Sequence, residues 1–416
     1  MARILAYTSP ARGHLFPVTP ILDELAARGH EITLRTLASQ VELMRGRGFD
    51  TAPLDPAIER IEQDDYQASK PLDAQKRAVG VFCRRADHDA TDLAHAIKEV
   101  GPDMLLVDIN AAGALAVAEK WGGPWASWCP FPLPLPSRDA PPFGPGLRPA
   151  SGFAGRARDA AFRRVFSGAV ARLILHPINE VRNRVGVPPL ARVSEIYTGP
   201  PLLLYLTAEP FEYPRSDWPA NIRLVGPCNW DPPVEPAGWL DDIRQPVVLV
   251  TTSSEFQDDG RLVRCALDAL AGEDLHVVAT LPADDPAAFT VPPNAHVLPF
   301  LPHTQVLNRA VCAVTHGGMG ATQKALAHGV PVCAVPFGRD QPEVARRVEV
   351  AAAGSRLPAR QLRPDRLRTA VHQAIGRAEG AGRVAEAFAA AGGPRAAADA
   401  VETHLRGSKA ADPAGP

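Results

Sequence analysis

Short apolar runs recur along the chain and alternate with segments of helical periodicity. In the first half, residues 3–8, 31–37 and 103–108 are mostly apolar, and helical patterns cover 17–27 and 90–100. Apolar runs of this length predict buried strands, and strands that alternate with helices predict βαβ units. The first half therefore predicts a parallel sheet with helices packed against it.

The same alternation begins again in the second half. Apolar runs at 247–253, 276–281, 312–316 and 330–336 predict a second set of strands with helices between them. Because 416 residues exceed what one hydrophobic core usually supports, two domains are expected. The predicted fold class is therefore α/β, with two doubly wound Rossmann-like domains.

Two proline-rich stretches interrupt these patterns. Residues 209–239 contain prolines and aromatics that cannot continue a helix or a central strand, so this stretch predicts the connection between the domains. Residues 130–155 form a second such stretch inside the first domain. We place the parts of the chain as follows: an N-terminal domain at 1–213, a linker at 214–238, a C-terminal domain at 239–405 and a frayed tail at 406–416.

Composition narrows the classes of function. The formal net charge is −2, and a chain without a basic excess is not expected to bind nucleic acid. The six cysteines are scattered without a C-x-x-C pair, which indicates neither a zinc site nor a disulfide framework. No apolar run approaches the roughly 18 residues of a membrane span, and the N-terminus lacks the apolar core of a signal peptide. These features predict a cytoplasmic protein, either a monomer or a homodimer, with no membrane span.

The most informative stretch runs from His316 to Gln341. The histidine ends an apolar strand, and after a helix and a further strand comes the pair Asp340-Gln341, which offers an acceptor and an amide to sugar hydroxyls. Between histidine and helix lie three glycines: Gly317, Gly318 and Gly320. Glycines let backbone N–H groups approach a phosphate, and the helix N-terminus adds about half a positive charge. The pattern predicts a site for a sugar nucleotide that needs no metal.

The order of these features resembles a family of inverting, nucleotide-sugar-dependent glycosyltransferases common in bacterial natural-product pathways. Members of the macrolide, polyketide and enediyne type, which are similar to UDP-glycosyltransferases, have the GT-B fold, in which two Rossmann-like domains face each other across a cleft. The resemblance implies that the first domain binds the acceptor and the second binds the NDP-sugar donor. It also implies that the 130–155 stretch covers the acceptor pocket. The NDP-sugar is a co-substrate, so no cofactor is expected, and no D-x-D motif follows an apolar strand to hold a metal.

The resemblance assigns the residues that bind the diphosphate. His316 is expected to donate a hydrogen bond to a phosphate oxygen. Ser253 and Ser254 occupy the place of a small polar turn that touches the diphosphate in this family. Backbone N–H groups at the helix start are expected to complete the site, those of Gly318, Gly320, Ala321 and Thr322, the last also through its hydroxyl. These donors would stabilise the leaving diphosphate.

The part that binds the base and ribose departs from the family pattern. Phe300 stands where the family often has a tryptophan stacked on the base, and phenylalanine can still stack with less area. Family members that use UDP carry a glutamine where this chain has His303 and a glutamate where it has Lys324, and both contact ribose hydroxyls. Their replacement is compatible with a deoxyribose donor, a TDP-sugar, and leaves UDP and TDP both open.

His14 and Asp108 are the candidate catalytic pair. His14 follows the first predicted strand, and Asp108 ends the strand at 103–108, so both emerge at the carboxyl edge of the sheet, where ligands bind in open α/β folds. A carboxylate that orients an imidazole makes a general base able to deprotonate an acceptor hydroxyl. The family carries its base in a G-H-hydrophobic-x-P turn, which Gly13, His14, Leu15 and Pro17 match, and its carboxylate at the position of Asp108.

Together these features predict an inverting, metal-independent hexosyltransferase that moves a hexose from an NDP-sugar to a hydroxylated, largely apolar natural-product aglycone. Two alternatives stay open. A sugar-nucleotide epimerase on the same fold would need a further base near the sugar, and a non-catalytic partner protein would carry a vestigial donor site. The sequence leaves open the acceptor, the sugar, and whether the new bond is to oxygen, nitrogen or carbon.

Overall fold

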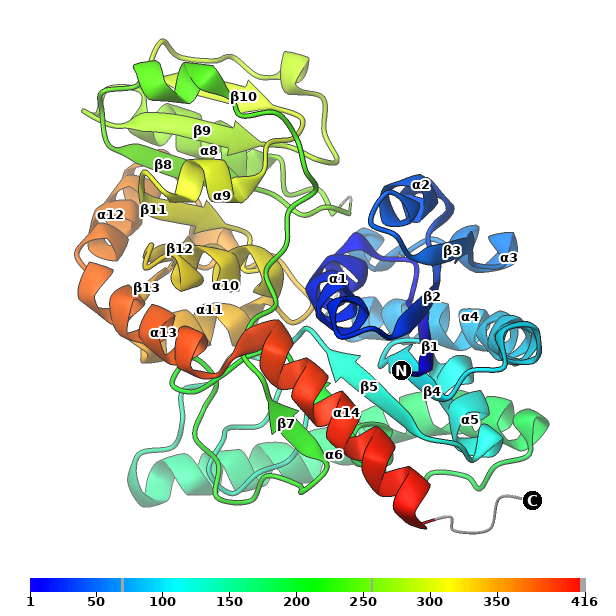
Figure 1. The fold of residues 1–416 in the computed structure, drawn as a ribbon. Coiled ribbons are helices and arrows are strands. Elements are labelled where there is room, and N and C mark those ends of the chain that lie inside the picture. Colours follow the sequence, from blue (N-terminus) through cyan, green and yellow to red (C-terminus); the bar gives the residue numbers. More distant parts are fainter. Residues whose placement is uncertain (69–70, 256, 412–416) are drawn as a thin grey trace.

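The chain folds into two α/β domains, each built around a parallel sheet (Figure 1). This computed structural model describes residues 1–68, 71–255 and 257–411. The first sheet has the order β3-β2-β1-β4-β5-β6-β7, and the second has the order β10-β9-β8-β11-β12-β13. Neighbouring strands are parallel in both sheets. The prediction of two doubly wound domains is confirmed.

The bounds of the elements follow the alternation of strand and helix. The first sheet consists of β1 (Arg3–Tyr7), β2 (Glu31–Thr36), β3 (Asp50–Pro53), β4 (Met104–Asp108), β5 (Trp125–Cys129), β6 (Leu203–Tyr205) and β7 (Ile222–Leu224). Its helices are α1 (Arg12–Ala27), α2 (Val41–Arg45), α3 (Pro56–Glu59), α4 (Pro71–Val100), α5 (Ala112–Trp121), α6 (Gly152–Val185) and α7 (Glu195–Thr198). The short 3₁₀ turns along the chain are η1 (Ala38–Gln40), η2 (Asp65–Gln67), η3 (Gly238–Asp242), η4 (Pro286–Ala288) and η5 (Ala359–Gln361).

The second domain repeats this plan. Its sheet consists of β8 (Val247–Thr251), β9 (His276–Thr280), β10 (Ala295–Leu298), β11 (Ala310–Thr315), β12 (Val332–Ala334) and β13 (Gly354–Arg356). The helices after the linker are α8 (Arg261–Leu270), α9 (His303–Leu307), α10 (Met319–Ala327), α11 (Gln341–Val350), α12 (Pro364–Ile375), α13 (Ala378–Ala390) and α14 (Gly393–Ala411). Each apolar run identified in the sequence overlaps one of the strands, because central parallel strands are buried on both faces and read as continuous apolar segments.

The predicted helices are present but longer than expected. The pattern at 17–27 belongs to α1, which begins at Arg12 and includes Pro17 and Pro20, and the pattern at 90–100 is the last third of α4. The apolar face of α1 is buried against the first sheet, which offsets the hydrogen bonds that the two prolines remove. The early start of α1 places His14 in its first turn.

The predicted boundary between the domains is wrong at its start. The expected linker at 214–238 contains β7, which pairs with β6 in the first sheet, so the chain leaves that sheet only after Leu224. It reaches η3 of the second domain at Gly238. A three-residue strand at the edge of a sheet pairs on one side alone, and prolines on either side of it are compatible with that position.

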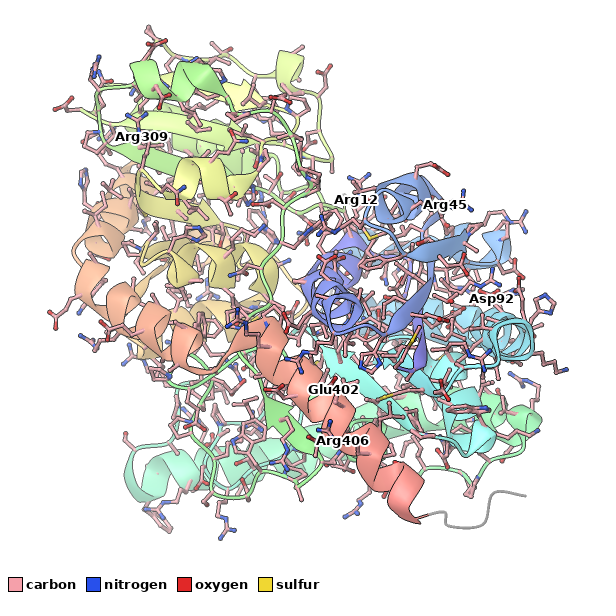
Figure 2. All side chains as sticks on the ribbon, in the orientation of Figure 1. Arg12, Arg45, Asp92, Arg309, Glu402 and Arg406 are labelled. Atoms are coloured by element: carbon pink, nitrogen blue, oxygen red, sulfur yellow. The ribbon has the colours of Figure 1, made fainter. Side chains whose placement is uncertain are left out.

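The last helix, α14, leaves the second domain and packs on the first (Figure 1). Its buried face joins the core around α1 through Ala397, Ala398, Val401 and Leu405. Figure 2 shows Glu402 on this helix, and its carboxylate accepts hydrogen bonds from Arg28 and His30, both at 3.1 Å. The predicted C-terminal domain at 239–405 therefore ends on the other domain. Of the predicted tail at 406–416, the first six residues continue the helix, and 412–416 lie outside the described residues.

A buried ion network joins the two domains. Arg347 of α11 donates two hydrogen bonds to Glu212, at 2.9 and 3.1 Å, and one to the Glu343 carboxylate at 3.1 Å. Arg215 and the Tyr205 hydroxyl also donate to Glu212. The side chains of Arg347 and Glu212 are 2% and 0% exposed, so the charges are removed from water and their pairing must compensate the lost hydration.

Two predictions from composition concern cysteines and membranes. All six cysteines lie within the described residues and are free thiols. In the part of the chain that the structure describes, no helix combines the length and the apolar character needed to cross a membrane.

We predict that Arg347→Met lowers the free energy of unfolding by about 3–5 kcal/mol, because it leaves the Glu212 and Glu343 carboxylates buried without this partner. Denaturant unfolding would measure the change, and Glu212→Gln in the same chain should recover part of it. Arg383→Met is the matched control, since that exposed arginine pairs only with exposed Glu379 and should change stability by less than about 0.5 kcal/mol. A change of that size for Arg347→Met would contradict the role given to the network.

Candidate active site

His14 and Asp108 meet at the carboxyl edge of the first sheet, as the sequence predicts. Asp108 ends β4, which pairs with β1, and His14 lies in the first turn of the helix that follows β1. The imidazole Nδ1 is 2.9 Å from Asp108 Oδ1. The Asp108 side chain is fully buried, and that of His14 is 14% exposed, so the imidazole alone reaches the cleft.

The Asp108 carboxylate is held in its ionised form. Its Oδ2 accepts hydrogen bonds from the Ser9 N–H at 2.9 Å and the Ser9 hydroxyl at 2.6 Å, and its Oδ1 accepts one from the Asn110 N–H at 3.0 Å. Burial alone would raise the pKa of Asp108, but His14 and these donors hold it below its ordinary value. An ionised carboxylate only accepts hydrogen bonds, so the proton between the two side chains belongs to His14 Nδ1.

The environment of His14 comes from both domains. Burial would lower the pKa of the imidazole, but Asp108 outweighs it, and Glu255 and Asp340 act in the same direction, so the pKa is raised. Glu255 follows β8 and Asp340 precedes α11, which places both in the second domain. The candidate base therefore faces the domain that carries the glycine-rich turn.

Two further side chains complete the surroundings of His14, and the sequence analysis missed both. The Asn110 amide nitrogen lies 3.1 Å from His14 Nε2, and the Phe131 ring lies 5.7 Å from the imidazole ring. Asn110 follows the end of β4 by two residues, and Phe131 follows the end of β5 by two. Their place just beyond the ends of buried strands was the signal that would have identified them.

The glycine-rich turn connects β11 to α10. Gly317 has a φ of +87°, which favours glycine, and a Cβ on Gly318 would lie 2.3 Å from His316 Nε2. A Cβ on Gly320 would meet no atom within 4 Å, so the fold itself does not require glycine there. The absence of a side chain at Gly320 instead leaves the helix start open to a ligand.

The N–H groups at the start of α10 differ in their hydrogen bonds. The N–H groups of Gly320 and Ala321 belong to the first turn of α10, where no helical carbonyl precedes them. The Thr322 N–H instead donates to the Gly318 carbonyl at 3.1 Å, and its hydroxyl pairs with that of Thr315 at 3.3 Å. The Thr322 N–H is therefore used within the helix, and its side chain is fully buried.

His316 is poised to meet a ligand. Its side chain is buried, and its Nδ1 has no hydrogen-bond partner among the described residues. Burial lowers the pKa of His316 below its ordinary value, which favours the neutral ring near pH 7. A buried, unpaired imidazole nitrogen is costly, and a phosphate oxygen at this place would satisfy it.

The predicted serine turn follows β8, the neighbour of β11 in the sheet, and Phe300 follows β10. The Ser253 N–H donates to Asp259 Oδ2 at 2.8 Å, and its hydroxyl oxygen accepts from the Glu255 N–H at 3.2 Å, which leaves the hydroxyl hydrogen free to donate. Ser254 is exposed. The Phe300 side chain is 46% exposed, an unusual degree for a large apolar ring, and its face is open to a planar partner.

Lys324 has a role that the sequence analysis did not predict. Its ammonium donates to the Trp230 carbonyl at 2.8 Å and pairs with the Asp231 carboxylate, both in the linker. Asp231 also accepts from the Thr304 N–H at 3.1 Å. Lys324 therefore anchors the linker to α10.

His303 is buried beside this ion pair. Its Nε2 lies 3.1 Å from the Thr280 hydroxyl oxygen. Burial, together with Lys324 and His316, lowers the pKa of His303 to about 4. The ring is therefore neutral near pH 7.

Asp340 and Gln341 differ in what surrounds their side chains. The Gln341 amide oxygen accepts from the N–H groups of Phe337 and Gly338 at 2.7 and 3.0 Å, and its amide nitrogen donates to Gln257 at 2.8 Å. These bonds hold the Gln341 side chain against the loop at 337–338 and against Gln257. Burial raises the pKa of Asp340, while Arg339 and His14 act in the opposite direction.

The proline-rich stretch at 130–155 reaches the second domain. Its distal part docks on α11, where Glu343 accepts from the N–H groups of Gly144 and Gly146 at 2.8 and 2.9 Å. Arg346 donates to the Gly146 carbonyl at 2.8 Å. A Cβ on Gly146 would lie 2.2 Å from the Pro342 carbonyl oxygen, so this contact between the domains is close.

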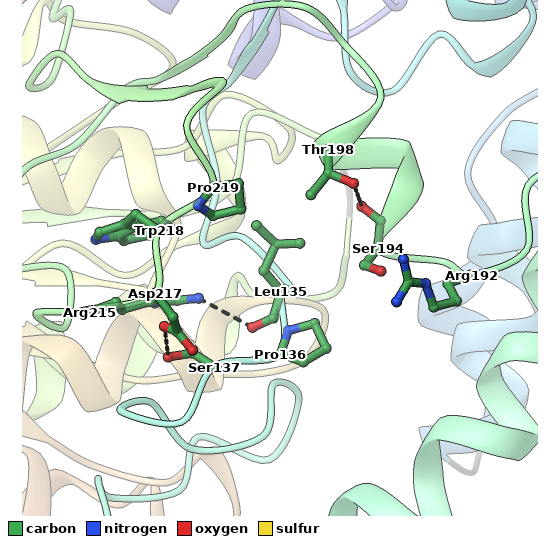
Figure 3. Close-up of a pocket in the computed structure, with 10 residues that line it drawn as sticks. All are labelled: Leu135, Pro136, Ser137, Arg192, Ser194, Thr198, Arg215, Asp217, Trp218 and Pro219. Carbon is green, nitrogen blue, oxygen red and sulfur yellow. Dashed lines mark hydrogen bonds between the residues drawn. The ribbon is translucent and has the colours of Figure 1, made fainter.

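A cavity of about 340 Å³ lies beside the start of that stretch (Figure 3). Leu135 to Ser137 form one wall, and the segment from Arg215 to Pro219 forms another. None of the predicted catalytic or donor residues lines it. The cavity is therefore separate from the His14 and His316 side chains.

Comparison with known proteins identifies the family. Residues 264–403 match the C-terminal domain described as Erythromycin biosynthesis protein CIII-like. The 4'-demethylrebeccamycin synthase of Lentzea aerocolonigenes is 33% identical over 390 residues, which cover 90% of this chain and 92% of that protein. The chain belongs to the natural-product glycosyltransferases.

Solved structures agree in fold along the whole length of this glycosyltransferase. The glycosyltransferase of kitacinnamycin superposes with a TM-score of 0.73 at 26% identity and covers 97% of this chain and 99% of its own. The glycosyltransferase VinC, solved in complex with DTDP, superposes with a TM-score of 0.71 at 20% identity and covers 98% of this chain and 100% of its own. The predicted GT-B fold is confirmed.

We predict that Gly320→Ala separates folding from ligand binding. The substitution should raise the free energy of unfolding by up to about 1 kcal/mol, because alanine favours a helix. It should weaken binding of UDP or TDP by about tenfold, equivalent to about 1.4 kcal/mol, because a methyl group enters the space open to the phosphates. Thermal unfolding and calorimetric titration would measure the two effects.

Two variants serve as comparisons for Gly320→Ala. Gly382→Ala in α13 also has open space around the added methyl and should stabilise the fold without changing nucleotide affinity. Gly317→Ala should destabilise the fold, because of its φ of +87°. Unchanged nucleotide affinity in Gly320→Ala would show that the phosphates bind elsewhere.

Proposed function

We propose that this glycosyltransferase moves a hexose from a UDP- or TDP-sugar to a hydroxyl group of an aglycone, with inversion and with His14 as the general base. The observation that carries the proposal is the orientation of His14. Its Nδ1 is bound to a buried, ionised carboxylate, while charges of the second domain lie near its ring. That arrangement suits a base that takes a proton between the two domains.

The proposed reaction is a single displacement. The acceptor hydroxyl gives its proton to His14 Nε2, and its oxygen attacks the anomeric carbon from the side opposite the diphosphate. The bond from that carbon to the diphosphate oxygen breaks, and the nucleoside diphosphate leaves. Asp108 stabilises the imidazolium that forms.

The second domain would stabilise the leaving group. His316 has an unpaired buried nitrogen, and the first turn of α10 presents free N–H groups beside it. Such donors stabilise a diphosphate where its charge develops. Among the described residues, no group of three or more His, Cys, Asp or Glu side chains is placed to hold a metal ion, which supports a metal-independent proposal.

The surroundings of the base support an aglycone with apolar and aromatic surface. Phe131 lies beside the His14 ring, and Trp128 is buried below it with its indole N–H donating to the His14 carbonyl at 3.3 Å. The 4'-demethylrebeccamycin synthase relative and the VinC structure with DTDP support a natural-product acceptor and a thymidine nucleotide in the donor. The Lys324 and Asp231 ion pair changes the charge pattern around the predicted ribose site and supports testing TDP beside UDP.

Mass spectrometry of reactions with panels of NDP-sugars and aglycones tests this function directly. We expect a mass gain of one hexose on an aglycone, release of the nucleoside diphosphate, inverted anomeric configuration and initial rates that EDTA does not change. Conversion of the NDP-sugar to an isomer without acceptor would indicate the epimerase instead. Nucleotide binding without turnover across the panels would indicate the non-catalytic partner, and loss of activity with EDTA would contradict the metal-independent mechanism.

We predict that His14→Ala lowers transfer to an alkyl alcohol by about 10²–10⁴-fold, the usual contribution of a general base, and leaves nucleotide affinity unchanged. The base form of His14 exists above its pKa, which is raised above the ordinary value of about 6.5. The rate should therefore fall as pH drops through a value above about 6.5.

The Asp108→Asn variant tests whether the titration of His14 causes this dependence of the rate on pH. Removing the carboxylate lowers the pKa of His14, so the acidic limb of the pH profile should move to lower pH while the maximal rate falls. Steady-state rates between pH 5 and 9 would show both effects. An acidic limb at the same pH in this variant would mean that His14 is not the group that titrates.

A further inference from the structure

The nitrogen of His14 that would take the proton is already engaged in the structure. Because Nδ1 donates its hydrogen to Asp108, the neutral ring carries its lone pair on Nε2. The Asn110 amide nitrogen lies 3.1 Å from Nε2. An amide nitrogen donates and does not accept, so Asn110 places a hydrogen on the lone pair that the reaction needs.

Asn110 is held in this position by the catalytic carboxylate itself. Its backbone N–H donates to Asp108 Oδ1 at 3.0 Å, and the next N–H, that of Ala111, donates to the Asp108 carbonyl at 3.0 Å. Both bonds close a turn at the end of β4, just before α5 begins at Ala112. One carboxylate thus orients the imidazole and the amide that covers it.

We propose that Asn110 is a positioning residue that caps His14 Nε2 until an acceptor hydroxyl displaces it. The proposal rests on the proposed function of His14 as general base. With the donor bound alone, water at Nε2 would give its proton to the imidazole, and its oxygen would attack the anomeric carbon. The products of that reaction are free sugar and nucleoside diphosphate, so the cap suppresses hydrolysis of the donor.

The cap discriminates between water and acceptor through buried surface. Either molecule replaces one hydrogen bond at Nε2 with another, so the exchange at the nitrogen itself favours neither. An aglycone also buries apolar surface against Phe131, and water has none to bury. The aglycone therefore has a driving force for displacing Asn110 that water lacks.

The first test measures hydrolysis and transfer in the same variant. Nucleoside diphosphate release from UDP- and TDP-sugars is followed without acceptor and with a phenolic aglycone at saturating concentration, at which the aglycone has already displaced the cap and transfer no longer bears its cost. In Asn110→Ala we expect the ratio of hydrolysis to transfer to rise about three- to tenfold, the range for loss of one hydrogen bond. Ser9→Ala is the control, because it weakens the other side of Asp108 and should lower both reactions in parallel. An unchanged ratio in Asn110→Ala overturns the proposal.

The second test does not depend on turnover. The ring nitrogens of His14 are titrated by NMR in the full chain without donor, where Asp108, Glu255 and Asp340 are the charged groups that face the ring. The amide donates to the neutral ring, so Asn110→Ala should raise the pKa of His14, and Asn110→Asp should raise it further by adding a carboxylate. A pKa that stays unchanged in both variants overturns the contact on which the cap depends.

The two tests separate the possible failures. Transfer with an unchanged hydrolysis ratio overturns the cap and leaves the glycosyltransfer reaction standing. Absence of both hydrolysis and transfer in the unaltered protein, with the pKa of His14 moving as expected, overturns the proposed function and the cap role that rests on it.

Discussion

The buried pair between Glu212 and Arg347 sets how the two domains meet. Glu212 lies on the segment that follows β6, and Arg347 lies on α11. Arg347 also binds Glu343, whose other oxygen accepts from Gly144 and Gly146 of the proline-rich stretch. Charges removed from water in this way require nearly complete pairing, so the network is satisfied only when both domains and the stretch are in register. Such a contact specifies an arrangement more than it adds stability.

The position of α11 affects the candidate site through the residues at the start of that helix. Asp340 is its N-cap and Gln341 its first residue, and Gln341 binds the turn at Phe337 and Gly338. Asp340 acts on the His14 ring from the second domain while Asp108 acts from the first. The pKa of His14 thus depends on the junction of the domains as well as on the edge of the first sheet.

The sequence predicted those parts of the site that follow from local patterns. Buried strand ends identified His14 and Asp108, and the glycine-rich turn identified His316 and the start of α10. The roles of Lys324 and Gln341 were not predictable, because their partners Asp231 and Gln257 lie 93 and 84 residues away. Asn110 was missed although it is local, since an asparagine after a strand is an ordinary turn residue until its amide is seen on Nε2. β7 was missed because three residues between prolines carry no periodicity.

His303 and Lys324 differ from the family pattern, and their surroundings argue for a maintained donor site. Unpaired polar groups and charges in the interior of a protein are costly. Here the lysine at 324 is matched by Asp231, that carboxylate also binds the Thr304 N–H, and His303 is bound to Thr280. The one buried imidazole nitrogen left unpaired among these residues belongs to His316, at the place where a phosphate oxygen would lie. The pairing of Lys324 and His303, together with the unpaired nitrogen of His316, favours an enzyme over a protein with a vestigial donor site.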